Sequence, residues 1–237
     1  MALISELKDE PWRRRLYLPT YKVSEVAQYA HVSSKTVVDW HRVGGRKAVT
    51  LSVRESRAAL SYMQLIEVAV VAAFRASGLT LARVRDAREY VSKTFRSEFP
   101  FAEYRFKREG KRLLLGFEQV GGASGAGKYV DATAGGQLVW ESFVSPRLQE
   151  FEYEDGGIAI RWHVAGGKSP ILIDPQMSFG APTVRGVPTW VITGRWKAGE
   201  SIADIANDFD LNKLDVRKAL QFEGVTPDLK RPSIWVH

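Results

Sequence analysis

The glycine-rich segment at residues 122–128 has the residue types and spacing closest to a known chemistry. Its sequence, GASGAGK, fits the G-x-x-x-x-G-K pattern, in which backbone N–H groups and a lysine surround phosphate groups. That chemistry also needs a Ser or Thr after the lysine to hold magnesium, and a helix that begins at this point. Tyr129 follows Lys128 instead, and the next residues favour a strand. We therefore predict a flexible hairpin loop; loss of nucleotide binding on Lys128→Ala would support the alternative, a nucleotide-dependent enzyme.

Other combinations of catalytic or metal-binding residues are missing from the sequence. Cysteine is absent, which excludes a disulfide framework, a zinc ribbon and a cysteine nucleophile. The glutamates at residues 150–154 share one strand face, which is typical of solvated surface. The histidines lie far apart, without the spacing of metal ligands: His31, His41, His163 and His237. We predict a protein that is not an enzyme and that uses neither a metal nor a cofactor.

Charge is unevenly distributed along the 237 residues. Residues 1–112 contain 22 Lys and Arg against 12 Asp and Glu, whereas residues 113–237 contain 12 against 15. A basic half indicates a polyanionic partner. The longest apolar run, at residues 68–74, is far shorter than the roughly 20 residues that a membrane span needs. We expect a cytoplasmic protein without a membrane partner.

Two short helical patterns follow one another from Tyr21. Apolar residues recur at helical spacing in the first, and Ser24 is expected to cap it. A short break at residues 31–32 separates it from the second, which Ser33 or Ser34 is expected to cap. Two short helices joined by a tight turn are typical of a helix-turn-helix.

The second helix of such a motif enters the major groove of DNA with its N-terminal residues. We therefore predict that its polar and charged residues face bases or phosphates: Ser33, Ser34, Lys35, Thr36, Asp39 and Arg42. A Gly-Gly turn at residues 44–45 between β-forming residues predicts a hairpin with Arg46 and Lys47 near its tip. This hairpin would be a wing that adds phosphate contacts, which give affinity but no sequence information.

Residues 56–75 are strongly apolar at helical spacing, and Gly78 separates them from a basic helical pattern at 79–95. A helix that is apolar on most faces is either buried centrally or shared with a second chain. Because a two-fold protein reads a two-fold operator, we expect residues 57–75 and the following helix to form a homodimer contact.

From about residue 99 the pattern changes to short antiparallel strands, expected at 113–117, 128–130, 137–140, 151–153 and 158–164. A strand at 171–173 and a loop to Pro188 precede helices expected at 190–197, 202–209 and 213–222. The last two helices form a second helix-turn-helix-like motif with its turn at 210–211. The predicted fold class is α+β: a winged helix at 20–97, a β-rich middle section at 98–168, a small helical domain at 170–224 and a tail at 225–237.

Two parts of the sequence resemble known families. Residues 21–96 resemble the MerR-type winged-helix domain, through VSEVA at 23–27 and GLTLARVR at 78–85. Residues 171–223 are similar to a short uncharacterised domain found in many bacterial antitoxin-like proteins. The matching stretches are IDP at 173–175, FGAPTVRG at 179–186, AGESIADIA at 198–206 and VRKAL at 216–220.

Together these parts resemble VapB-type antitoxins of type II toxin–antitoxin modules, whose usual partners are PIN-like ribonuclease toxins. The resemblance implies a dimeric antitoxin that inhibits its toxin and binds operator DNA to repress its own promoter. The section at 98–168 has no equivalent in the smallest members. The alternative is a stand-alone MerR-like transcriptional regulator with a small-molecule effector.

The C-terminal tail, residues 228–237, is the candidate contact with the toxin. A PIN-like nuclease holds divalent metal with clustered carboxylates, so a cation or a covering segment can block it. An aromatic anchor beside basic residues is typical of a binding hot spot. The residues expected to make the contact are Lys230, Arg231, Ile234 and Trp235. The alternative is a terminal strand that completes a sheet.

Overall fold

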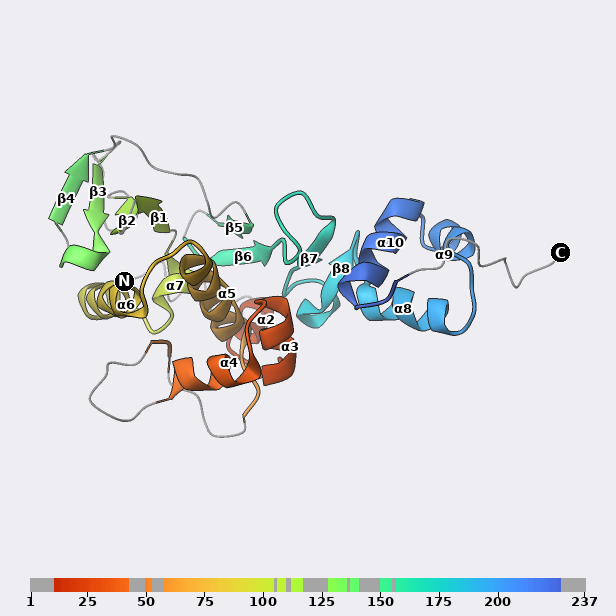
Figure 1. Ribbon diagram of the computed structural model, residues 1–237, viewed down its shortest axis with the longest axis horizontal. Coiled ribbons are helices and arrows are strands. Elements are labelled where there is room, and N and C mark those ends of the chain that lie inside the picture. Colours follow the sequence, from red (N-terminus) through yellow and green to blue (C-terminus); the bar gives the residue numbers. More distant parts are fainter. Residues whose placement is uncertain are drawn as a thin grey trace. The chain divides into compact units, whose positions relative to one another are not determined.

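The computed structural model of the protein consists of two compact units, Met1–Ile160 and Arg161–His237, which are described separately (Figure 1). We call them the N-terminal and C-terminal units. The structure describes residues 11–42, 50–52, 58–104, 106–109, 112–116, 128–135, 137–140, 150–154 and 157–226.

The N-terminal unit is built around one apolar helix, α5 (Tyr62–Ala76). The other helices are α2 (Pro11–Arg15), α3 (Val23–Tyr29), α4 (Ser34–His41), α6 (Leu81–Phe95) and α7 (Pro100–Glu103). Helices α3, α6 and α7 pack against α5, and the ring of Phe101 meets that of Phe74 edge-on at 5.7 Å. The apolar surface of α5 is therefore largely buried within its own chain, which is one of the two alternatives for this helix.

The start of α5 differs from the prediction. The apolar pattern suggested a helix from residue 56 or 57, but α5 begins at Tyr62, because Ser61 caps it. The Ser61 hydroxyl accepts a hydrogen bond from Gln64 N (3.3 Å), and the Gln64 side chain accepts one from Ser61 N (3.0 Å). Just before the cap, Leu60 pairs with Tyr21 in an antiparallel β-bridge, which holds the chain extended.

Capping also sets the starts of α3 and α6. Ser24 was expected to cap α3, and this is wrong, because the helix begins at Val23 with Lys22 as its cap residue. The Glu25 carboxylate accepts a hydrogen bond from Lys22 N at 2.7 Å. The helix expected from residue 79 begins two residues later, after Thr80, whose hydroxyl accepts from Arg83 N.

Two groups of antiparallel strands follow in the N-terminal unit (Figure 1). The first sheet has the order β1-β2-β3-β4, with β1 (Phe106–Glu109), β2 (Arg112–Gly116), β3 (Lys128–Asp131) and β4 (Gln137–Trp140). The predicted strands at 113–117, 128–130 and 137–140 are confirmed, whereas β1 and the short helices α2 and α7 were not predicted. Lys128 opens a strand, so the glycine-rich segment does not lead into a helix; residues 121–127 lie outside the described residues.

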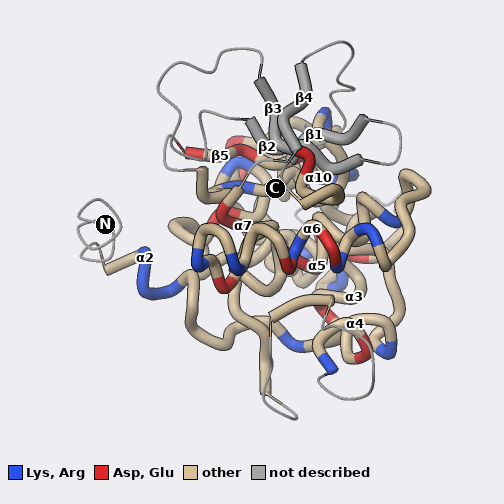
Figure 2. Tube along the Cα trace, turned by 90° about the vertical axis from the view of Figure 1, so that its left-hand side faces the viewer, with Lys and Arg blue, Asp and Glu red and all other residues tan. Residues whose placement is uncertain are grey.

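The hairpin predicted near residues 151–164 is also present, as β5 (Phe151–Tyr153) and β6 (Ala159–Trp162). It is joined to the N-terminal end of the described chain by Arg13, which donates two hydrogen bonds to the Glu154 carboxylate at 2.6 and 2.9 Å. Figure 2 shows the three consecutive arginines of α2, of which Arg13 is one, as a single blue segment.

The C-terminal unit begins within β6, where Trp162 pairs with Ile173 of β7 (Ile171–Ile173). Strands β8 (Pro182–Val184) and β9 (Val187–Pro188) and helices α8 (Thr189–Lys197), α9 (Ile202–Asp208) and α10 (Lys213–Phe222) follow. The segment before Pro188 was expected to be a loop, but it contains the antiparallel hairpin β8–β9. The predicted helices at 190–197, 202–209 and 213–222 are confirmed to within one residue at their ends.

Helices and antiparallel sheets thus coexist in one chain, and the predicted α+β class is confirmed. Within the described ranges, no helix is long and apolar enough to cross a membrane.

Gly157 provides a test of how closely the β5–β6 turn approaches α7. Its φ is +88°, and a Cβ at this position would lie 2.7 Å from the carbonyl oxygen of Glu103. We expect Gly157→Ala to lower the free energy of unfolding by more than the ~1–2 kcal/mol that a left-handed conformation costs an L-residue, because the clash adds to that cost.

The matched control is Gly78→Ala, where φ is +90° but a Cβ would meet nothing within 4 Å. The two variants can be compared by urea unfolding followed by circular dichroism. Equal losses in both would contradict the close approach of Gly157 to Glu103.

Candidate nucleic-acid interface

Helices α3 and α4 form the predicted helix-turn-helix, and the turn between them depends on one residue in the left-handed region. Ala30 N donates to Val26 O at 3.0 Å, His31 has a φ of +53°, and Val32 N returns to Ala27 O at 3.0 Å. Histidine is among the non-glycine residues that tolerate positive φ best. The turn predicted at residues 31–32 is therefore confirmed, with histidine at a position where glycine is common.

The turn between α9 and α10 has the same sequence of contacts. Phe209 N donates to Ile205 O at 3.3 Å, Asp210 has a φ of +53°, and Leu211 N returns to Ala206 O at 2.8 Å. Asn212 then caps α10 by accepting a hydrogen bond from the backbone N–H of its third residue at 2.7 Å. The predicted turn at 210–211 between two helices is thus present, and it repeats the first turn residue by residue.

The predicted DNA-contacting residues of the first turn of α4 divide into two groups. Ser33 is the N-cap: its hydroxyl accepts from Thr36 N at 3.0 Å and lies 2.8 Å from the Thr36 hydroxyl. These two side chains therefore hold the start of the helix. Ser34 and Lys35 are exposed beside them and are the residues of this turn best placed for a partner.

The remaining candidates lie at the other end of α4 and beyond it. Asp39 and Arg42 are exposed and form an ion pair at 3.7 Å, so the carboxylate offsets part of the positive charge of Arg42. Arg46 and Lys47, at the tip of the expected wing, lie outside the described residues.

A buried chain of hydrogen bonds supports the C-terminal end of α4. His41 Nδ1 lies 2.7 Å from Ser52 O, and Ser52 N donates to the Glu67 carboxylate on α5 at 3.3 Å. Glu67 is fully buried, and this burial raises its pKa to about 7, against the opposing effects of the Arg88 charge and the Ser52 hydrogen bonds. The segment at 50–52 is therefore fixed between α4 and α5, and it fixes the end of α4 in turn.

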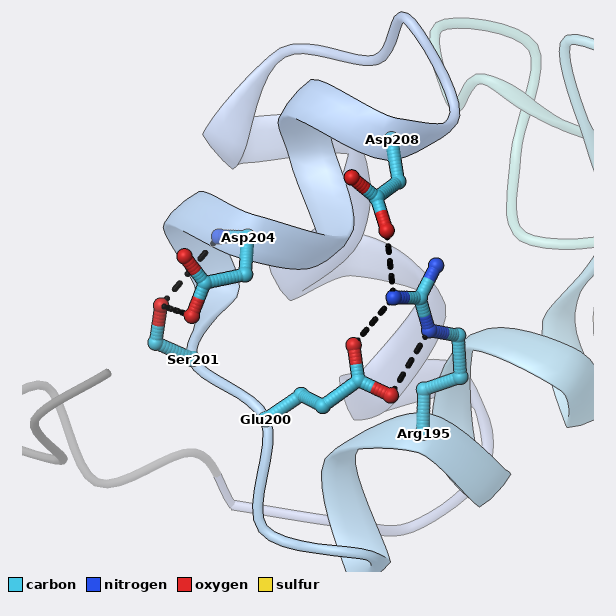
Figure 3. A network of polar contacts seen from close by, with 5 residues as sticks. All are labelled: Arg195, Glu200, Ser201, Asp204 and Asp208. Carbon is cyan, nitrogen blue, oxygen red and sulfur yellow. Dashed lines mark hydrogen bonds and ion pairs between the residues drawn. The ribbon is translucent and has the colours of Figure 1, made fainter. Parts of the chain in front are cut away.

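In the C-terminal unit, Arg195 of α8 holds α9 in place (Figure 3). Its Nε donates to Glu200 at 2.8 Å and its Nη2 donates to both Glu200 and Asp208, the last at 2.6 Å. The hydrogen bonds that Arg195 donates to Glu200 and Asp208 raise its pKa above its usual range. Ser201 caps α9: its hydroxyl accepts a hydrogen bond from Asp204 N at 3.2 Å.

Other kinds of site find less support. Among the residues that the structure describes, no group of three or more His, Cys, Asp or Glu side chains could hold a metal ion. The candidate toxin-contacting residues of the tail, Lys230, Arg231, Ile234 and Trp235, lie beyond residue 226, the last described residue.

Comparisons with known proteins give three findings. Residues 171–222 match a family described as a protein of unknown function (DUF433). A protein of Mycobacterium tuberculosis named "Putative antitoxin VapB45" is 23% identical over 235 residues, which covers 90% of this chain and 97% of that protein. The crystal structure of Rv2018 from Mycobacterium tuberculosis superposes with a TM-score of 0.60 at 21% identity, covering 87% of this chain and 99% of that chain.

The structural likeness shows a shared fold across most of the chain. Because the sequence match covers 90% of this chain, it cannot omit the section at residues 98–168. The match to this relative therefore extends into that section.

The sequence predicted no functional residue in the second helix-turn-helix, although on α10 the cation Lys213 is exposed and Arg217 and Lys218 are half-exposed. A signal was available in the sequence. The same pattern occurs at 27–33 and at 206–212. In each, an alanine is followed four residues later by the residue with positive φ, and the next two residues are an apolar residue and the N-cap of the second helix.

The buried Glu67 gives the N-terminal unit a predictable pH dependence. Its pKa in the folded protein, about 7, is above the ordinary 4.5, so the stabilisation is complete below about pH 4.5 and is lost as pH rises through about 7. We expect the free energy of unfolding to fall by ~3 kcal/mol over this interval, and Glu67→Gln to remove that fall.

Urea unfolding at a pH near 5 and at one near 8 measures the effect. Glu89→Gln is the control, because Glu89 is exposed on α6 and pairs only with Lys93 among the ion pairs of the described chain. If Glu67→Gln kept the pH dependence of the unaltered protein, another group would have to carry it.

Proposed function

We propose that this protein is the antitoxin of a type II toxin–antitoxin module. It binds and inhibits a PIN-like ribonuclease toxin, and it binds operator DNA as a homodimer to repress its own promoter. The observation that carries the proposal is the similarity to the VapB45 relative over 97% of that protein's length. The DUF433 match at residues 171–222 supports it, because that is the part of the sequence that resembles antitoxin-associated domains.

DNA binding through the first helix-turn-helix is supported by the turn and by the exposed residues that follow it. The first turn of α4 exposes Ser34 and Lys35, and its far end exposes Arg42. Side chains in these positions can reach base edges and the phosphates on either side of the major groove. Because α5 is largely buried in its own chain, the homodimer contact in this proposal falls mainly to the exposed side of α6, the helix that follows it.

Toxin inhibition is assigned to the basic and apolar tail at residues 228–237. A nuclease site that holds metal with carboxylates attracts Lys230 and Arg231, while Ile234 and Trp235 supply apolar anchors. The charge on the tail thus complements the chemistry of the site that it blocks.

Co-expression with the product of the adjacent gene tests the antitoxin role. We expect that product to arrest growth alone, and this protein to restore growth and to co-elute with it on size exclusion. Deletion of residues 228–237 should restore the arrest, because it removes both the cations and the apolar anchors. If the product of the adjacent gene is not toxic and forms no complex with this protein, the proposal is wrong. That result would favour the alternative, a transcriptional regulator that responds to a small molecule.

Operator binding by α4 is tested with Lys35→Ala combined with Arg42→Ala. If each side chain contacts a phosphate, the slope of log affinity against log salt should fall by about two for a duplex from the region upstream of the gene. Lys93→Ala with Arg96→Ala removes the same charge from exposed positions at the end of α6 and serves as the control. Fluorescence anisotropy across a salt series gives the slopes, and equal slopes for both double variants would contradict a contact through α4.

A further inference from the structure

We infer that the second helix-turn-helix, together with the hairpin β8–β9, forms a second surface for double-stranded DNA. The proposed function places DNA contact on α4 alone, so this inference adds a separate contact and does not depend on the first. Three observations support it: the geometry of the turn, the charge on α10, and the arginine that the hairpin presents to α10.

The turn places α10 relative to α9 as α4 is placed relative to α3. In both motifs an alanine carbonyl receives the hydrogen bond that closes the turn, from Val32 N to Ala27 and from Leu211 N to Ala206. The inward residue of the second helix is fully buried in each, as Val37 and Val216. Helix α10 therefore occupies the position of the helix that enters the major groove in DNA-binding helix-turn-helix proteins.

The outward face of α10 is more basic than that of α4. Lys213 is exposed, and Arg217, one turn later on the same side of the helix, is half-exposed. Lys218 is also half-exposed. Asp215, the one carboxylate in the sequence of α10, is buried. On α4, by contrast, Asp39 is exposed and pairs with Arg42.

The hairpin β8–β9 supplies an arginine whose charge offsets that of Asp215. Arg185 and Gly186 form its two-residue turn with φ values of +47° and +87°, the conformation of a type I′ turn. Arg185 Nε lies 3.2 Å from the Asp215 carboxylate, and its side chain remains 66% exposed. The ion pair therefore offsets the acidic charge in the first turn of α10 and holds the hairpin tip beside it.

An exposed leucine in the middle of this face fits DNA better than it fits solvent. Leu214 is 59% exposed and lies next to Lys213 at the start of α10. In the major groove, an apolar side chain contacts the methyl group of thymine, while the cations around it contact phosphates. On the neighbouring helix, Asp208 is bound by Arg195, which reduces repulsion of phosphates (Figure 3).

The test uses the full chain with Lys213→Ala and Arg217→Ala combined. Affinity for a labelled duplex from the region upstream of the gene should fall at least tenfold, and the salt slope should fall by about two. The control, Lys168→Ala with Lys197→Ala, removes the same charge from exposed positions of the same unit and should keep the slope of the unaltered protein.

The same pair is then combined with the α4 pair, Lys35→Ala and Arg42→Ala, and each protein is checked for folding by circular dichroism. Additive losses support two DNA surfaces. If DNA affinity falls in the α10 double variant but not in the α4 double variant, this inference is supported and the contact through α4 is overturned.

Unchanged DNA affinity in the α10 pair overturns the inference and leaves the contact through α4 standing. If the α10 pair instead loses inhibition of the toxin while its DNA affinity is unchanged, the surface belongs to a protein partner and the inference is wrong. An equal loss in the control pair also overturns it, because the effect would then reflect net charge.

Discussion

The orientation of each helix pair depends on one backbone constraint, a single residue with positive φ between the helices. At His31 and at Asp210 the chain changes direction, and the N–H of the next residue donates to an alanine carbonyl of the preceding helix. Because the return bond closes on alanine, the second helix can approach the first closely. A larger side chain at Ala27 or Ala206, both buried, would separate the helices and turn their outward faces away from a common partner.

The first pair is fixed a second time, at the far end of α4, by groups whose burial reduces stability. A carboxyl group without water costs free energy in its charged form, which is why the pKa of Glu67 rises to about 7. The Glu67 carboxylate accepts a hydrogen bond from Ser52 N, and Ser52 O lies within hydrogen-bond distance of His41 Nδ1 at the end of α4. Both ends of α4 are therefore held by specific hydrogen bonds, which apolar packing alone would not give.

Local features of the sequence were sufficient to predict α4, α10 and β4, because their caps and periodicity lie within the elements themselves. The same features did not predict the start of α5. The capping box of Ser61 starts this helix at Tyr62, several residues after the apolar pattern begins. The hairpin β8–β9 was missed because Arg185 takes a turn position that Asn usually occupies. Two of the candidate DNA-contacting residues, Ser33 and Thr36, form a hydrogen bond with each other. Their positions in the sequence are equally compatible with this bond and with contact to DNA.

The distribution of charge shows why a count over half a chain is a poor guide to a polyanion-binding surface. Residues 113–237 contain more acids than bases, yet the acids of the second helix-turn-helix are largely engaged. Asp215 is paired with Arg185 and Asp208 with Arg195, and both pairs join residues distant in sequence. A phosphate at the surface interacts with the exposed charges within about 10 Å, since more distant ones are screened by salt. What determines its attraction is therefore the set of cations left on one face after the folded chain has formed its own ion pairs.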